Sequence, residues 1–275
     1  CVTGVQTCAL PIYPWGMDYN NDGDLFMINT VIGHLWQVMP GARYDRMYGS
    51  HFNPYTYQTM EQSADHYHWN RAGGEAWHDT KKIGVTPETD RSGGGHAHCG
   101  MLYYGDDQWP EKYRDSILTC NLLGHRINRD LLVPRGNGFV GRHRPDFART
   151  SDTWFRGIEL VRSHDQGFYL LDWQDTGECH ENDGVHRTSG RIYKVNFGKG
   201  KTGAPDLGQL SEELLVQKLV GDRWQFEQAS MELRTRMARN ERTEQRVVDL
   251  VKQHQSPDHA NLSLFRTQLS SDCGS

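Results

Sequence analysis

The amino-acid sequence predicts a mainly β protein with a helical C-terminal part: an incomplete β-propeller, with about four blades present of six expected, followed by the start of an α-solenoid. Three observations predict this fold class. A strand pattern that ends in Asn or Asp occurs three times, and each copy is followed by a glycine and a second alternating strand. Glycine, tryptophan, tyrosine and histidine are plentiful, with 29, 8, 12 and 14 residues, which favours turns and short aromatic-rich strands. Leucines at helical spacing appear only after Gly203.

Length and charge limit the possible classes of protein. A chain of 275 residues forms one large or two modest domains and can bury a substantial core. The net charge of -5 argues against nucleic acid as a partner. No apolar stretch reaches membrane-spanning length, and lysine and arginine are dispersed. We therefore expect no membrane span in this chain.

Residues 1–12 resemble the translation of a sequencing adaptor rather than a natural protein start. They begin without Met and lack the basic region and the apolar core of a signal peptide. We expect an adaptor-derived scar here and a natural N-terminus that is missing, so Cys1 and Cys8 are left out of the motif search. The other four cysteines show no CxxC or CxxCH spacing, which excludes a zinc knuckle and a haem attachment motif in this chain.

The repeated pattern predicts three pairs of strands. The polar residues that end the first strands, Asn29, Asn121 and Asp172, are 92 and 51 positions apart, close to two units and one unit of the roughly 40 to 50 residues of a propeller blade. We therefore predict a partial propeller over residues 13–203 whose strand pairs form adjacent antiparallel blades. The first strands lie within 22–29, 115–121 and 165–172, and the second strands within 33–38, 124–129 and 190–195.

The part of the chain between Val38 and His96 is predicted to hold a further blade with a long insertion, because alternation is weak there. It contains an H-x-H pair, His66 and His68, and a second pair, His96 and His98, lies at its end. Such a pair on a strand points both imidazoles to one face, which suits a metal or a polar channel. We expect surface or hydrogen-bonded roles for the first pair. For the second pair, which follows a glycine run that lets backbone approach closely, we expect a role facing a ligand.

Residues 172–187 carry the densest chemistry in the chain, in a loop between two predicted strands. A binding or catalytic role competes with a simpler interpretation, in which the Asp and Asn side chains only cap turns. One loop rarely encloses a substrate or supplies a calcium ion with all its oxygens. If the loop is a site, at least one residue from an earlier blade must approach it. The expected partners are Asn121, His125, His96 and His98.

Residues 204–255 are predicted to form helices in the manner of HEAT-like repeats. Ser211 is a plausible N-cap, with Glu212 and Glu213 in the first turn. Two further apolar stripes follow, around Leu233 and around Val247. The alternative is a single helical cap packed on the propeller. Residues 256–275 are predicted to be a polar tail.

An ordered series of motifs connects the chain to a known family: GHAHCGM (95–101), WPEKYRDSIL (109–118), NRDL (128–131), DTWFRG (152–157), the loop 172–187 and GRIYK (190–194). Together they resemble the membrane-bound dehydrogenase family of planctomycete-type bacteria, and the likeness runs from about Tyr13 to Glu232. Members of that family have an N-terminal propeller similar to the soluble quinoprotein glucose and sorbosone dehydrogenases. Helical repeats and often a haem-binding CxxCH domain follow it.

The resemblance implies an activity. In such enzymes pyrroloquinoline quinone (PQQ) lies on the propeller axis beside calcium and takes a hydride from a sugar or alcohol carbon, while a side-chain base removes the hydroxyl proton. It therefore implies a quinoprotein-like oxidoreductase that passes electrons to a cytochrome c domain outside this chain. The implied location is the periplasm or the cell envelope.

The implied chemistry needs a general base, groups that contact the quinone, and oxygen ligands for calcium. The candidates for the base are His96, His98, His125, His180 and His186. The candidates for contact with the quinone are Arg126, Arg156, Trp173 and Arg187. The candidates for calcium are Asp172, Asp175, Glu178 and Asp183.

One departure from the family pattern keeps other functions open. Where the sugar dehydrogenases read His-Gly, this chain has Leu123 and Gly124. A propeller can keep its scaffold without the redox chemistry, so a non-catalytic carbohydrate- or protein-binding propeller is the alternative. A calcium-dependent lactone hydrolase is a weaker alternative, because Asn29, Asn121 and Asp172 end equivalent strands.

Overall fold

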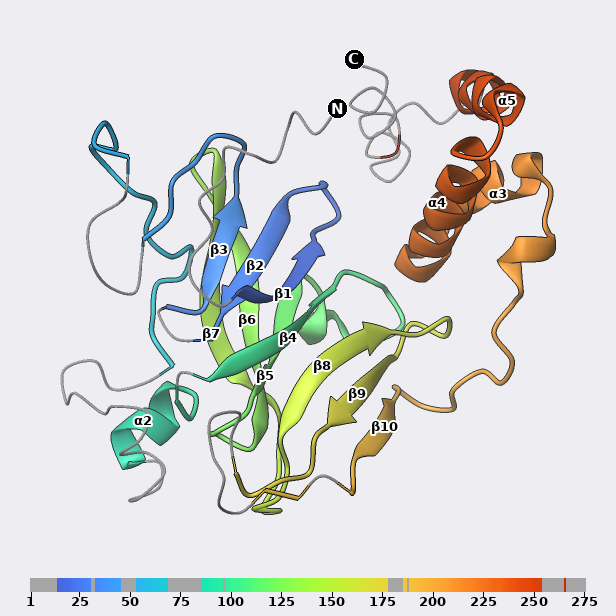
Figure 1. The fold of residues 1–275 in the computed structure, drawn as a ribbon. Helices are drawn as coiled ribbons and strands as arrows, with labels where there is room; N and C mark the ends of the chain where they lie inside the picture. Colours follow the sequence, from blue (N-terminus) through green and yellow to red (C-terminus); the bar gives the residue numbers. More distant parts are fainter. Residues whose placement is uncertain are drawn as a thin grey trace.

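A computed structural model describes residues 14–30, 33–45, 53–68, 86–95, 97–177, 185–186, 188–253 and 265. These residues form mostly β-sheet, with a few helices at the C-terminal end, as the sequence predicted. Three antiparallel sheets follow one another in chain order (Figure 1). The first sheet contains β1 (Pro14–Tyr19), β2 (Leu25–Asn29) and β3 (Leu35–Val38). The second contains β4 (His98–Tyr104), β5 (Ser116–Asn121), β6 (Arg126–Arg135) and β7 (Gly138–Arg149). The third contains β8 (Gly157–Arg162), β9 (Phe168–Asp172) and β10 (Arg191–Val195).

The three predicted strand pairs are confirmed as β2 with β3, β5 with β6 and β9 with β10, all antiparallel. Asn29, Asn121 and Asp172 end the first strand of each pair and are all buried. The backbone of each one pairs with a residue at the start of the second strand or directly before it. These facing residues are His34, Arg126 and Arg191.

The predicted blade between Val38 and His96 has no sheet strand in its described residues, 39–45, 53–68 and 86–95. They contain isolated β-bridges, Tyr44 with Met60 and Ala64 with Gly141, and a short helix, α2 (Pro87–Ser92). The number of blades therefore stays a prediction, with three sheets in the described part of the chain.

The first strands of the sheets, β1, β4 and β8, pack side by side, with β4 in the middle (Figure 1). Glycines permit this close approach. A Cβ on Gly16 would lie 2.8 Å from the backbone nitrogen of Met101, and a Cβ on Gly100 would lie 2.6 Å from Cα of Glu159. Gly100 also has φ +57°, a conformation that other residues rarely adopt.

The core lies between successive sheets. Phe26, Ile28 and Leu35 of the first sheet meet Met101 and Ile117 of the second in one cluster. A second cluster joins the second and third sheets. Its largest members are Tyr104, Trp109, Leu118, Phe155, Leu160 and Phe168.

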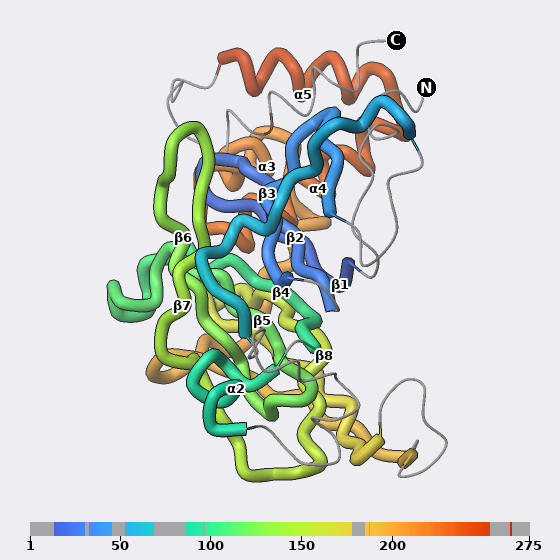
Figure 2. Tube along the Cα trace, turned by 90° about the vertical axis from the view of Figure 1, so that its left-hand side faces the viewer, coloured from blue at the N-terminus to red at the C-terminus, as the bar shows by residue number. Residues whose placement is uncertain are grey.

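The C-terminal part is helical, as predicted, with α3 (Glu212–Lys218), α4 (Arg223–Met237) and α5 (Glu241–Gln253). The Ser211 hydroxyl accepts from the backbone N–H of Leu214, which confirms the predicted N-cap. The helices share a core of their own and gather at the end of the molecule away from α2 (Figure 2). Whether they begin a solenoid stays a prediction. Within the described residues, no helix is long and apolar enough to span a membrane.

Candidate metal centre

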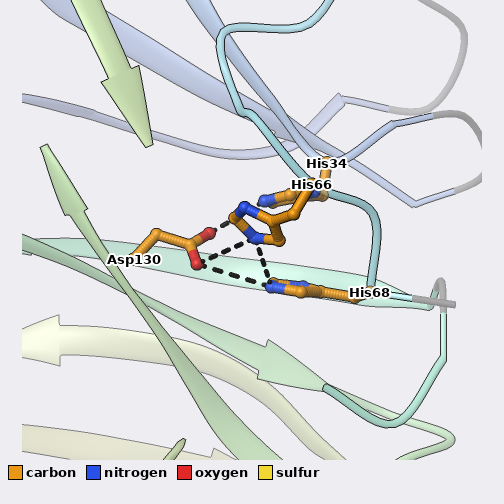
Figure 3. A group of neighbouring side chains, drawn as sticks. All are labelled: His34, His66, His68 and Asp130. Carbon is orange, nitrogen blue, oxygen red and sulfur yellow. Dashed lines mark hydrogen bonds and ion pairs between the residues drawn. The ribbon is translucent and has the colours of Figure 1, made fainter. Parts of the chain in front are cut away.

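Four side chains that are distant in sequence converge between the first and second sheets: His34, His66, His68 and Asp130 (Figure 3). One potential ligand atom from each lies within 4.8 Å of all the others. His34 directly precedes β3, the H-x-H pair lies between β3 and α2, and Asp130 belongs to β6. Packing of the two sheets therefore creates the cluster.

Asp130 owes its position to the middle of a four-stranded sheet. It pairs with Ile117 of β5 on one side and with His143 of β7 on the other. Residues two apart on a strand share a face, and Leu132 lies in the core between the first and second sheets. The Asp130 side chain therefore points into the protein, where it is only 1% exposed.

The H-x-H segment runs between β3 and β7 (Figure 2, cyan). The N–H of Ser63 donates to the Leu35 carbonyl at 2.7 Å, and the N–H of Gly141 donates to the Ser63 carbonyl at 2.7 Å. We call this segment, residues 61–68, the strap. On it His66 and His68 are two residues apart, and both imidazoles point toward Asp130 (Figure 3). The shared direction agrees with the period of an extended chain.

One carboxylate oxygen of Asp130 lies among imidazole nitrogens. Its Oδ1 is 3.2 Å from Nε2 of His66, 3.4 Å from Nε2 of His68 and 3.5 Å from Nδ1 of His143. The Nε2 atoms of His66 and His68 are 3.0 Å apart. The other oxygen, Oδ2, is 2.8 Å from Nε2 of His34. Although Oδ1 is buried, it accepts no hydrogen bond from His66, His68 or His143.

The triangle formed by Asp130 Oδ1 and the Nε2 atoms of His66 and His68 matches the spacing of ligands on one metal ion. Its edges are 3.0, 3.2 and 3.4 Å. Ligands about 2.1 Å from a metal, in tetrahedral or octahedral positions, are about 3.0 to 3.4 Å apart. The triangle therefore has the edge lengths that three ligands on one ion require.

The electrostatics of His34, His68 and Asp130 favour the protonation states that metal ligands need. Burial lowers the pKa of His68 to about 3 and also lowers the pKa of His34. Burial opposes ionisation of Asp130, but His68 and His34 outweigh it and hold the pKa of this carboxyl well below its ordinary value. For His66, burial is outweighed by Asp130 and Asp65, which raise its pKa. At neutral pH the cluster therefore offers neutral imidazoles at His34 and His68 and an anionic carboxylate.

Asp130 differs from the other buried carboxylates with ion partners in the described part of the chain. Asp106 contacts Arg162, Asp165 contacts Lys194, and Asp172 contacts Arg191. The ion-pair partners of Asp130 among the described residues are all histidines. A buried charge without a permanent cation is costly, and a bound metal ion would balance it.

Of the predicted catalytic histidines, the structure places His98 beside the cluster. Nε2 of His98 is hydrogen-bonded to Nδ1 of His68, and the ring centroids are 4.5 Å apart. His125 lies elsewhere, with Nδ1 3.0 Å from the Phe155 carbonyl and 3.1 Å from a guanidinium nitrogen of Arg156. Burial and the charge of Arg156 lower the pKa of His125.

The described acids of the 172–187 loop are bonded within the fold. Asp172 Oδ1 accepts from the N–H groups of Arg156 and Gln174, and its Oδ2 accepts from Arg191 at 2.6 Å. Asp175 accepts from two loop N–H groups, those of Gly177 and His186. The His186 ring pairs with Ser189 and stacks edge-on against Trp154. The bonds of Asp175 therefore match the simpler interpretation, in which the acidic side chains of the loop cap turns.

The predicted quinone contacts also have partners in the fold. Arg126 is buried and pairs with Asp90 at 2.6 Å and Asp146 at 2.9 Å. Arg156 donates to the Thr176 carbonyl at 3.2 Å, so Arg156 links His125 to the described part of the loop. Trp173 donates its backbone N–H to the Arg156 carbonyl. Five candidates lie outside the described residues: His96, Glu178, His180, Asp183 and Arg187.

Asn121, the other expected partner of the loop, bonds instead to the glycine run. Its side-chain amide donates to the carbonyls of Gly93 and Gly95, and its oxygen accepts from Gly124. No bond from Asn121 or His98 to the described part of the loop is present.

Sequence reasoning did not single out His34, Asp130 or His143, and it expected surface or hydrogen-bonded roles for His66 and His68. Two signals were available. His34 occupies the position that Arg126 and Arg191 hold in the other strand pairs. Asp130 is a charged residue that directly follows the predicted strand within 124–129 and precedes the apolar run 131–133.

Comparison with solved structures found glucose dehydrogenases at low identity. Two are described as glucose dehydrogenase, with 16% and 18% identity and a TM-score of 0.37 each; they cover 68% and 67% of this chain. A third is assigned as an oxidoreductase (glucose dehydrogenase) from Thermus thermophilus, with 14% identity, a TM-score of 0.39 and 66% coverage of this chain. The matches span 44%, 45% and 44% of those structures, less than half of their length.

Comparison with sequence families gives a clearer result. No curated protein matches the chain. The family described as "Domain of unknown function (DUF7133)" matches residues 12–197, which include every residue of the metal-centre cluster. The chain belongs to this DUF7133 family.

Proposed function

We propose that this protein binds one divalent transition-metal ion between its first and second sheets, with His66, His68 and Asp130 as ligands and His34 directly beside them. The observation that carries the proposal is the triangle of Asp130 Oδ1 and two Nε2 atoms, with edges of 3.0 to 3.4 Å around a buried oxygen that makes no hydrogen bond. Imidazole and carboxylate donors suit zinc, iron, manganese or cobalt. Calcium and magnesium prefer sets made only of oxygen.

Metal content tests the proposal directly. The purified protein is stripped with a chelator, dialysed against zinc, iron(II) or manganese in turn, and analysed by elemental mass spectrometry. We expect about one ion per chain for at least one of these metals. Failure of all three to bind would contradict the proposal.

Matched variants show where the ion binds. His68→Asn and Asp130→Asn should lose the ion, because each removes one corner of the ligand triangle. His125→Asn changes a histidine far from the cluster and should keep it. His66→Asn provides a second loss variant at a partly exposed position, should the buried variants fail to fold. Retention of the ion by all three cluster variants would show that it binds elsewhere.

Oxidation of a sugar or an alcohol by a quinone remains a second candidate function, supported by the motif resemblance and not by the geometry of the described residues. The described calcium candidates, Asp172 and Asp175, already accept from N–H groups, and Arg126 is paired with two carboxylates. These residues do not offer a convergent set of free oxygens for calcium. A cytochrome partner and a periplasmic or cell-envelope location belong to the same proposal.

A dye-reduction assay with PQQ, calcium and a panel of sugars and alcohols tests this second function. Substrate-dependent reduction that requires both additions would support it. If activity is absent from a protein that is folded and loaded with its transition metal, the binding propeller becomes the better interpretation of this domain.

A further inference from the structure

We infer that the metal is held by three protein donors, and that its remaining coordination positions bind a small anion, such as a carboxylate, from solution. The inference rests on the proposed metal function and adds a ligand class to it. The three donors are Nε2 of His66, Nε2 of His68 and Oδ1 of Asp130, the corners of the triangle in Figure 3.

Each donor side chain is oriented by a neighbour through its other polar atom. His66 Nδ1 lies 3.1 Å from Oδ1 of Asp65. His68 Nδ1 is hydrogen-bonded to Nε2 of His98. When Nδ1 carries the proton, Nε2 is free to bind a metal, and this arrangement is common around metal-bound histidines. The backbone N–H of His143 donates to His66 Nδ1 at 3.3 Å. This bond requires an unprotonated Nδ1, so metal binding through Nε2 exchanges it for a bond from Nδ1–H to Asp65.

His34 is assigned as a positioning residue rather than a fourth ligand. Its Nε2–H donates to Oδ2 of Asp130 at 2.8 Å, which directs Oδ1 toward the two histidines. Adding His34 widens the ligand set to 4.8 Å, whereas the three-atom set spans 3.4 Å. Two ligands about 2.1 Å from one ion can be at most about 4.2 Å apart. The three-donor set therefore has the spacing of ligands on one ion, whereas the four-atom set is too wide.

A three-donor centre leaves positions for ligands from solution, and the burial of the cluster shows which side they would reach. The side chains of His34 and His68 are fully buried, while those of His66 and His143 are 17% and 24% exposed. The His143 ring lies 5.2 Å from the His66 ring. The centre is therefore nearest to solvent on the side of His66 and His143.

Charge favours an anion on that side. A divalent ion with one carboxylate and two neutral imidazoles has a net charge of about +1 in a site of low polarity, which attracts an anionic ligand. Among the described residues, the ion pair beside His66 and His143 is that of Asp65 and Arg142, whose charges face each other at 3.6 Å and balance one another. The positive charge of the metal centre is therefore the one that no neighbouring pair balances on this side.

Cobalt(II) spectroscopy tests the inference in the whole purified chain. The protein is loaded with cobalt(II), and azide and then acetate are titrated while the visible absorption of the ion is recorded. We expect a saturable change of the spectrum with both anions. Bound cobalt whose spectrum is unchanged by either anion would show a coordinatively complete site and would overturn the inference while leaving the proposed metal function intact.

A variant distinguishes the role of His34. His34→Gln should still bind one cobalt ion, with affinity reduced about 10- to 100-fold, as for other residues that orient ligands, and should still respond to azide. Complete loss of cobalt, as expected for His68→Asn, would make His34 a fourth ligand and count against the three-donor centre. If the wild-type chain binds none of cobalt, zinc, iron(II) and manganese, both the proposed function and this inference fail.

Discussion

Metal binding should raise the thermal stability of the protein by a predictable amount. The centre joins the strap at 61–68, which is held between β3 and β7, to Asp130 in the middle of the second sheet. Unfolding separates these segments, so the ion binds the folded chain far better than the unfolded one. At a free metal concentration 100 times Kd, binding contributes about 2.7 kcal/mol. For a chain of 275 residues, that corresponds to a rise in Tm of about 5 °C.

Differential scanning calorimetry of the stripped protein, with and without the metal, measures this shift. Asp130→Asn should unfold at a temperature that does not depend on metal, because the variant lacks the charged corner of the triangle. His125→Asn should keep the full shift, since its imidazole bonds to Phe155 and Arg156 away from the centre. An equal shift in Asp130→Asn and the wild type would refute the reasoning, since the stabilising ion would then bind elsewhere.

Three further predictions concern the scaffold. Asp172→Ala should lower the free energy of unfolding in urea by about 3 kcal/mol because it removes the acceptor for Arg191 and for two backbone N–H groups; unchanged stability would show that these bonds contribute little. Burial opposes ionisation of Asp165, but Lys194 and its other donors outweigh it and lower the pKa of this carboxyl. The contribution of Asp165 to the free energy of unfolding should therefore be at its full value above about pH 4. It should decrease as the pH falls toward the pKa of Asp165 in the folded protein. An acid-unfolding profile identical to that of Asp165→Asn would contradict this. Gly100→Ala should destabilise the fold by more than about 1 kcal/mol, since Gly100 has φ +57° and the added Cβ would lie 2.6 Å from Cα of Glu159; an unchanged midpoint of thermal unfolding would refute it.

Local patterns in the sequence predicted local structure well. Alternation and glycine position predicted the three strand pairs, and Ser211 before two glutamates predicted the start of α3. These features depend on residues within a few positions of one another, so their physical causes are visible in a short stretch of sequence.

The candidate site was harder to predict because its parts meet only after the sheets pack. His34 and Asp130 are 96 positions apart and form their 2.8 Å contact across two sheets. The H-x-H rule gave the shared direction of His66 and His68, but it gave no partner for them. In the 172–187 loop, the same residue types that can bind calcium can also bond to backbone N–H groups, as Asp172 and Asp175 do. Composition alone does not separate these two uses of a carboxylate.

X-ray absorption at the K-edge of the metal, in the loaded protein, tests the central claim most directly. The geometry predicts only nitrogen and oxygen neighbours at about 2.0 to 2.2 Å, with the outer-shell scattering of two imidazole rings from His66 and His68. Asp130→Asn should lose this signal together with the metal. A first shell that contains sulfur, or one made only of oxygen without imidazole scattering, would contradict the proposed centre.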